Sequence, residues 1–109
     1  MGDTRHHAII VTSFDIKAIT EAYINAVNIF EPKMVTDIIK SPVNIFYSII
    51  VVPDGGKEGW HNSNRFDRKR ADFIAWVESQ ADGEGGNSLT YCEVQYGDDF
   101  GDQRMINHN

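Results

Sequence analysis

The sequence predicts an α+β domain with the ferredoxin-like, split βαβ order β-α-β-β-α-β, extended by a C-terminal hairpin strand. Two stretches, His7–Thr12 and Ile45–Val52, are short and almost continuously apolar, which is typical of inner strands buried on both faces. Apolar residues at helical spacing follow each stretch, and an alternating pattern lies near the C-terminus. The first and third strands are central in this topology, and the two apolar stretches hold these places. We therefore expect two helices on one face of a mainly antiparallel sheet.

Length and composition favour a single domain. The chain has 109 residues, of which 41% are hydrophobic and 24% charged, so it can bury a core of its own. We expect residues 1–109 to form one domain, with residues 1–5 frayed. The single cysteine, the lack of a signal-peptide pattern and the lack of an apolar run of about 20 residues favour a cytoplasmic protein without membrane contact. The formal charge of −6 disfavours nucleic acid as a partner, because phosphate binding depends on lysine and arginine.

The first helix is predicted between the two apolar strands. Thr12 and Asp15 have the spacing of a capping box, in which two side chains satisfy free backbone amides at a helix start. Glu31 and Pro32 end the helix, because the residue before a proline is pushed out of the α region. The apolar residues between these signals recur at intervals of three and four, so they should face the sheet. They are Ile16, Ile19, Tyr23, Ala26, Val27 and Phe30.

The segment Val35–Lys40 has an ambiguous pattern. Its loose alternation favours an edge strand, although Val35, Ile38 and Ile39 also fit one turn of helix. We expect the edge strand, whose unpaired backbone groups would allow a homodimer. After the central strand, Pro53–Gly56 has the composition of a turn.

The second helix is predicted to begin at Asn64, whose side chain can cap the first turn. Its buried stripe contains four apolar residues, Phe66, Phe73, Ile74 and Val77. Its charged residues are expected to face water, and they are Arg65, Arg68, Lys69, Arg70 and Asp72.

The last part of the chain predicts a glycine-rich loop at 81–87 and then a β-hairpin. Leu89–Tyr96 alternates with a period of two, which is typical of a half-exposed strand. Gly97–Asp102 has turn composition, and Arg104–Ile106 is expected to return as the partner strand.

Three stretches resemble a set of short proteins encoded by tailed bacteriophages and prophages. They are Ile9–Ser13, the loop Pro53–Trp60 with the sequence PDGGKEGW, and Glu93–Asp99 with the sequence EVQYGDD. The set has no assigned activity. The resemblance implies a phage setting and a small accessory role against host machinery, and it implies no catalytic residues.

The acidic turn near the C-terminus is a candidate metal site. Tyr96-Gly97-Asp98-Asp99 is similar to the metal-binding turn of polymerases, and Asp15 is a conceivable third carboxylate. A chain of this length cannot hold the other parts of a polymerase, so we expect plain turn aspartates. Asp98, Asp99 and Asp102 could gather a calcium ion, but their spacing differs from that of an EF-hand. We expect no metal and no catalytic residue here.

The histidines and the cysteine form no recognisable metal pattern. His6 and His7 are adjacent in a strand and should point to opposite sides of the sheet, so they cannot easily bind one ion. Cys92 lies beside Thr90 and Val94 on one side of the alternating strand, where we expect a packing residue. No cofactor is expected.

Two regions remain as candidate binding surfaces. Trp60, with Lys57 and Glu58 beside it, either packs over the core or anchors a partner, and the acidic turn residues would add to that contact. The partner-binding residues are then Trp60, Lys57, Glu58, Asp98, Asp99 and Asp102. The other region is a basic group that could bind an anion or stay solvated: Arg65, Arg68, Lys69 and Arg70.

We therefore expect a small acidic phage accessory protein that binds a host macromolecule and inhibits or redirects it by steric occlusion. The alternative is a small-ligand or nucleotide-binding module that uses the Lys57–Arg70 region. Gly55-Gly56-Lys57 lacks the spacing of a phosphate-binding loop. A metal-dependent enzyme is the third and weakest interpretation.

Overall fold

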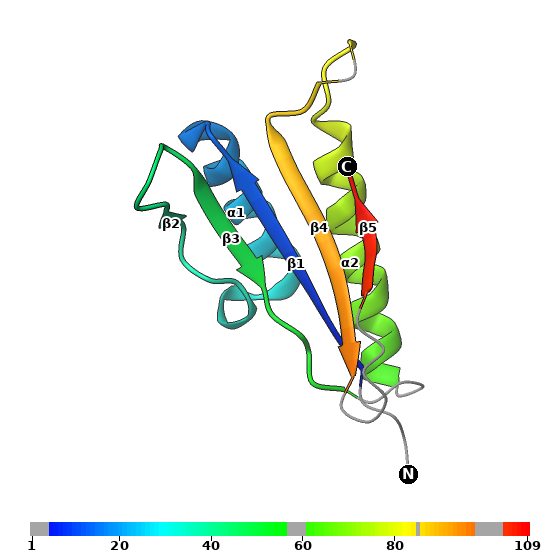
Figure 1. Cartoon of the computed structure of the whole chain (residues 1–109). Helices are drawn as coiled ribbons and strands as arrows, with labels where there is room; N and C mark the ends of the chain where they lie inside the picture. The colour runs from blue at the N-terminus through cyan, green and yellow to red at the C-terminus, as the bar shows by residue number, and fades with distance from the viewer. Residues whose placement is uncertain (1–4, 57–60, 85, 98–103) are drawn as a thin grey trace.

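The computed structural model describes residues 5–56, 61–84, 86–97 and 104–109, and within them two helices pack on one face of a five-stranded sheet (Figure 1). The strands run in the order β2-β3-β1-β4-β5, and every neighbouring pair is antiparallel. The elements are β1 (Arg5–Ser13), α1 (Ile16–Phe30), the short 3-10 helix η1 (Pro32–Met34), β2 (Ile39–Lys40), β3 (Tyr47–Val51), α2 (His61–Ser79), β4 (Leu89–Gly97) and β5 (Arg104–His108). The α+β, ferredoxin-like prediction is confirmed, with β5 added outside β4 and β2 reduced to two residues.

The core lies between the helices and one face of the sheet. Ile9 and Val11 on β1 and Ile49 on β3 are fully buried. The two helices meet through Phe30 and Phe73, whose ring centres are 5.8 Å apart in an edge-to-face arrangement. Aromatic pairs of this geometry add to the stabilisation that burial alone provides. The core therefore holds both helices on the same side, and they lie behind the sheet in Figure 1.

Within the part of the chain that the structure describes, no helix packs against the other face of the sheet, so the expectation of strands buried on both faces is wrong. Ile10 and Ile50, which are paired across β1 and β3, lie on this face and are partly exposed. The predicted strand at Ile45–Val52 is also too long. Ile45 and Phe46 precede β3 and are exposed, because Asn44 takes a positive φ of 63° and turns the chain before the strand begins. A continuous apolar run did not distinguish these turn residues from the strand that follows them.

The predicted helix starts need correction. Asp15 is the N-cap of α1 and accepts a 3.0 Å hydrogen bond from Lys17 N, whereas Thr12 lies in β1 and hydrogen bonds to Ser48 across the sheet. The capping box was therefore wrong about Thr12. Asn64 is not a cap either, because α2 already begins at His61. On α1, Ile16 is exposed, since the buried stripe begins one turn later. The buried residues of α1 are Ile19, Ala22, Ala26 and Phe30.

The ambiguous segment at 35–40 is extended rather than helical. Val35 forms a single bridge to Val51, and Thr36 exchanges hydrogen bonds with the backbone of Ile50. Regular strand structure is limited to the two residues of β2. The prediction of an edge strand is right in type but too long.

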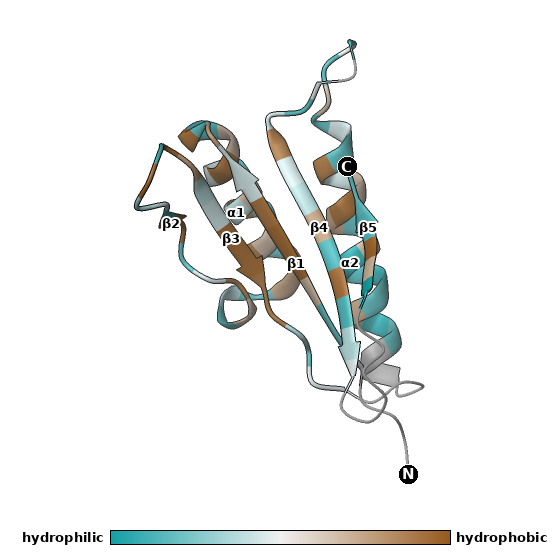
Figure 2. Ribbon diagram, viewed as in Figure 1, coloured by the Kyte–Doolittle hydropathy of each residue, from teal (hydrophilic) through white to brown (hydrophobic). Residues whose placement is uncertain are grey.

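The predicted antiparallel pairing of the last two strands is confirmed, whereas residues 98–102 of the predicted turn lie outside the described residues. In β4, the residues on the helix side are buried, and they are Leu89, Tyr91, Glu93 and Gln95. Figure 2 shows that the strand changes between apolar and polar residues along its length. A register shift between Glu93 and Val94 marks a bulge in the pairing with β5. Among the described residues, no helix is both long and apolar enough to cross a membrane.

Candidate functional site

A buried arginine between α2 and the sheet gathers acidic side chains around it, of which Asp54 and Glu93 are buried and Asp67 is partly exposed. The Arg70 side chain on α2 is only 3% exposed, and its guanidinium contacts three carboxylates. Nη1 donates to Asp54 Oδ1 at 3.1 Å, Nη2 donates to Asp67, and Nε lies 3.7 Å from Glu93 Oε2. His7 Nδ1 lies 3.6 Å from the same Glu93 oxygen. We call these five residues the Arg70 cluster.

One turn and a partner strand position two carboxylates of the Arg70 cluster, Asp54 and Glu93. Asp54 follows β3, and its second oxygen accepts a 3.1 Å hydrogen bond from Gly56 N. Gly55, between them, has a φ of 82°, which explains the glycine at this point of the turn. On β4, Glu93 Oε1 accepts a 2.8 Å hydrogen bond from Asn107 Nδ2 on β5. The cluster thus joins α2, the turn after β3, and strands β1, β4 and β5.

Electrostatics keep Glu93 ionised. Burial by itself raises the pKa of Glu93, but the interactions with His7 and Asn107 and the positive charge of Arg70 outweigh burial and lower the pKa below its usual value. The guanidinium contacts all three carboxylates, so each of them lies beside a positive charge although carboxylates outnumber the cation. Among the described residues, no three His, Cys, Asp or Glu side chains are placed to hold a metal ion.

The predicted basic group does not form one surface. Arg70 was expected to face water and is instead buried, because carboxylates from three other places in the chain neutralise it. Arg65 and Arg68 are exposed. The Arg65 guanidinium carbon and Lys69 Nζ lie 5.5 Å and 5.2 Å from the centre of the Phe66 ring. These distances are within the range of cation–π contacts, so the ring holds two of the four cations.

A pocket of about 460 Å³ lies next to Phe66, between η1, the end of β3 and the first half of α2. Its apolar lining comes from Met34, Val52, Pro53 and Phe66, and its charged lining comes from Glu31, Lys33, Asp54 and Arg65. Glu31 has a φ of 83°, a conformation that costs a non-glycine residue about 1–3 kcal/mol. Lys33 Nζ lies 3.5 Å from the Glu31 carboxylate. The pocket therefore combines an apolar wall with charges of both signs.

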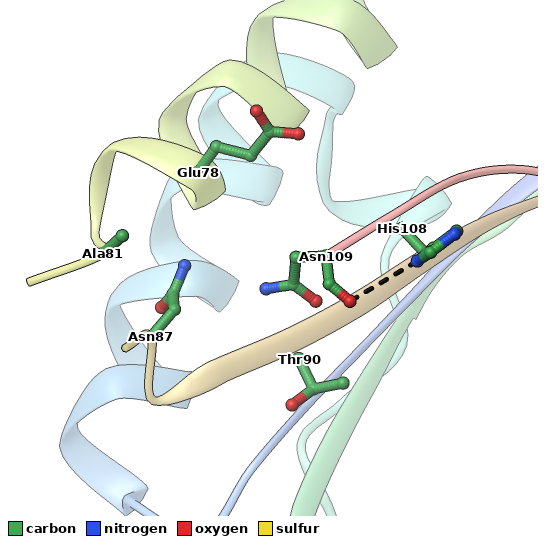
Figure 3. A pocket seen from close by; sticks show the side chains of 6 residues that line it. All are labelled: Glu78, Ala81, Asn87, Thr90, His108 and Asn109. Atoms are coloured by element: carbon green, nitrogen blue, oxygen red, sulfur yellow. Dashed lines mark hydrogen bonds between the residues drawn. The ribbon is translucent and has the colours of Figure 1, made fainter. Parts of the chain in front are cut away.

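A second pocket, of about 540 Å³, lies where α2, β4 and β5 meet (Figure 3). Figure 3 shows Glu78 and Ala81 on the helix side, with Thr90, His108 and Asn109 on the sheet side. The Asn109 side chain accepts from Tyr91 N at 3.0 Å and donates to Leu89 O at 2.7 Å.

The groups around this second pocket hold the structure together. Asn87 donates a 2.8 Å hydrogen bond to Val77 O at the end of α2. The Tyr91 hydroxyl donates to Glu78, and burial together with this carboxylate raises the pKa of Tyr91. Asn87, Asn109 and Glu78 are thus already engaged in contacts that close this end of the sheet.

Six residues predicted to bind a partner lie outside the described residues, and they are Lys57, Glu58, Trp60, Asp98, Asp99 and Asp102. Asp15 does lie within them, and its place disfavours a shared carboxylate site with the acidic turn. Asp15 follows the Ser13 end of β1, whereas Gly97, which precedes the acidic turn, pairs with Arg5 at the opposite end of the same strand. The length of β1, about 30 Å at 3.4 Å per residue, separates the two ends.

The predicted placement of His6 and His7 on opposite sides of the sheet, and of Cys92 on the side of Thr90 and Val94, agrees with the structure. His7 contacts Glu93 on the helix side, while the His6 ring lies 5.0 Å from the Tyr96 ring on the other face. Cys92 lies in β4 and is partly buried on the face without helices.

Exposed apolar side chains gather at one end of the sheet, which sequence reasoning missed. Phe14 follows β1 and Phe46 precedes β3, directly beyond the paired residues Ser13 and Tyr47. Ile16 opens α1, and the turn between β2 and β3 adds two more residues. We call this group the apolar end: Phe14, Ile16, Val43, Ile45 and Phe46.

The side chains of the apolar end are between 41% and 72% exposed. The apolar end is at the upper left of Figure 1, and Figure 2 shows its hydrophobic turn. The available sequence signal was Pro42 and Asn44, turn-forming residues that flank Val43.

The chain matched no protein-family model, no curated protein and no solved structure.

Proposed function

We propose that this protein binds another protein through the apolar end and acts by blocking that partner sterically. The observation that carries the proposal is the gathering of five exposed, large apolar side chains from two separate segments of the chain, residues 14–16 and 43–46. Exposed apolar groups of this kind mark interaction sites, and aromatic residues among them are the usual anchors. Phe14 and Phe46 are the anchors here, with Val43 and Ile45 beside them on the turn.

The chemistry of the partner follows from the charge of the chain. A formal charge of −6 favours approach to a basic surface, so we propose a partner with an apolar depression rimmed by lysine or arginine. The resemblance to short phage proteins supports a host protein as this partner and inhibition or redirection as the outcome. Trp60, Asp98, Asp99 and Asp102 are proposed as a second contact region of the same partner.

The experiment uses the full chain with an affinity tag, produced in a bacterium. A photoreactive amino acid at position 45 is expected to crosslink one protein in stoichiometric amount, and the same group at position 24 is expected not to. Ile24 is a fair control because it is 51% exposed on α1 but outside the apolar end.

The crosslinked protein is then purified, and its affinity is measured. We expect Ile45→Asp to weaken binding at least about tenfold, the scale of one hot-spot residue, and Ile24→Asp to leave binding unchanged. Recovery of no crosslinked protein in several hosts would count against the proposal, as would an Ile45→Asp variant that binds like the wild type. Trp60→Ala and Asp99→Asn test the second region separately.

The pocket beside Phe66 supports a second candidate function, the binding of a small anionic ligand. Arg65 would meet the anionic group, while Met34, Val52 and Phe66 would contact an apolar body. A thermal-shift screen of small phosphorylated and carboxylated compounds tests this function. One compound should raise the Tm of the wild type, Arg65→Ala should abolish the shift, and Arg68→Ala should preserve it, because Arg68 does not line the pocket. An equal shift of the Tm in all three proteins, or no shift in the wild type, would rule out the binding of a small anionic ligand in this pocket.

A further inference from the structure

The face of the sheet opposite the helices carries a continuous band of apolar residues. The strand register places Ile50, Ile10 and Cys92 in one row across β3, β1 and β4. Ala8, Val94 and Met105 form the next row across β1, β4 and β5. We call these six residues the apolar band. None of them belongs to the core between helices and sheet, and Figure 1 shows the strands in front of both helices.

The band is flanked by polar groups other than Asp, Glu, Lys and Arg. On one side the register continues with Ser48, Thr12 and Thr90, and the hydroxyls of Thr12 and Ser48 are 2.8 Å apart and hydrogen bonded. On the other side His6 lies against Tyr96, and His108 on β5 pairs with Cys92 at the end of its row. Among the described strand residues, none on this face is Asp, Glu, Lys or Arg. The described part of this face thus has no Asp, Glu, Lys or Arg, in a chain whose formal charge is −6.

We propose that this face is covered by the same face of a second copy of the chain, which gives a symmetric dimer with two packed sheets. A face without Asp, Glu, Lys or Arg on its described strands favours a second copy of the chain as the partner that covers it. Two copies that each carry a charge of −6 repel one another, and an uncharged face is where they can approach without burying like charges. If a partner placed charged side chains at the contact, those side chains would lose their hydration and would meet no opposite charge on this face. Nucleic acid would find no lysine or arginine on the described strands of this face.

The size of the face fits a dimer. β1 and β4 have nine residues each and β3 and β5 have five each, so at about 3.4 Å per residue and about 4.8 Å between strands they cover roughly 460 Å² before side-chain relief is added. A standard interface takes about 800 Å² from each partner, so sheet-on-sheet packing with its side-chain relief gives a dimer interface at the small end of the range. The edge strand β2 offers only two residues for pairing, so it is a poorer contact for a homodimer.

Light scattering coupled to size exclusion tests the dimer. Over a dilution series that reaches about 100 μM, above the micromolar limit for an interface of this size, the wild type should show twice the 12.3 kDa mass of the chain. Val94→Glu and Met105→Glu should both give the monomer mass with unchanged circular dichroism. Met105 is 56% exposed, so its variant is expected to fold even where Val94→Glu does not. Ile24→Glu, on the exposed side of α1, should remain dimeric.

The single cysteine provides an independent measurement. Cys92 lies within the apolar band, so maleimide should label it more slowly as the protein concentration rises, and Met105→Glu should remove that concentration dependence. A wild type that stays monomeric throughout the series would overturn the proposal. A dimer that survives Met105→Glu would overturn it too, as would one that dissociates on Ile45→Asp, because the contact would then lie elsewhere.

Discussion

Arg70 Nη1 on α2 donates a 3.1 Å hydrogen bond to Asp54 Oδ1 in the turn after β3, and both side chains are at most 5% exposed. This contact fixes the turn after a central strand to the middle of α2, 16 residues further along the chain. Glu93 on β4 contacts the same guanidinium. The positive charge of Arg70 therefore stabilises buried carboxylates from two other parts of the fold, the turn after β3 and strand β4.

Removal of the Arg70 charge should destabilise the fold strongly. In Arg70→Met the carboxylates of Asp54 and Glu93 stay buried without their cation, and the free energy of unfolding should fall by about 3–5 kcal/mol. Urea denaturation followed by circular dichroism measures this change. Arg68→Met is the matched control, since Arg68 is exposed, and its effect should stay within about 0.5 kcal/mol. Equal effects of the two substitutions would contradict the role given to the Arg70 cluster.

Glu93 should make stability depend on pH on the acid side. Its pKa is lower in the folded protein than in the unfolded chain, so the folded state holds this proton less tightly. Its contribution is fully present above the unfolded glutamate pKa of about 4.3 and is lost as pH falls through the lowered folded pKa. The difference in free energy of unfolding between wild type and Glu93→Gln should therefore be largest above about pH 5 and shrink on acidification. Glu21→Gln, at an exposed site on α1, should show no such trend.

Glu31→Gly should stabilise the protein. Glycine adopts the φ of 83° at this position without strain, and the exposed ion pair with Lys33 that is lost contributes little. Allowing for the greater freedom of glycine in the unfolded chain, we expect a gain of about 1 kcal/mol in the free energy of unfolding. Glu31→Ala removes the same carboxylate but keeps the strain, so it should give no gain. A stabilising alanine variant would mean that the carboxylate, and not the backbone, is unfavourable.

Tyr91 should resist ionisation until the protein unfolds. Burial and the Glu78 carboxylate raise its pKa, so its contribution to stability is present below the unfolded tyrosine pKa of about 10 and is lost as pH rises above it. An absorbance titration near 295 nm should show that one of the four tyrosines ionises only together with loss of structure. In Tyr91→Phe this last step should be absent. If the step instead disappears in Tyr23→Phe, the assignment to Tyr91 is wrong.

Local patterns in the sequence predicted most of the fold. The spacing of apolar residues placed α1, and Glu31-Pro32 placed its end, because both signals act through backbone conformation over a few residues. The alternation in Leu89–Tyr96 likewise indicated a strand with two different faces. These features depend only on neighbours along the chain, so one sequence is enough to predict them.

The surroundings of each side chain were decided by the tertiary structure. Arg65, Arg68 and Arg70 look alike in the sequence, yet Arg70 alone of the three is buried, because Asp54 and Glu93 reach it from distant segments. Ile45 looks like Ile49 in the same apolar run, yet Asn44 turns the chain so that Ile45 is exposed. A sequence determines which residues alternate or recur, whereas burial and charge pairing depend on what the folded chain brings against them.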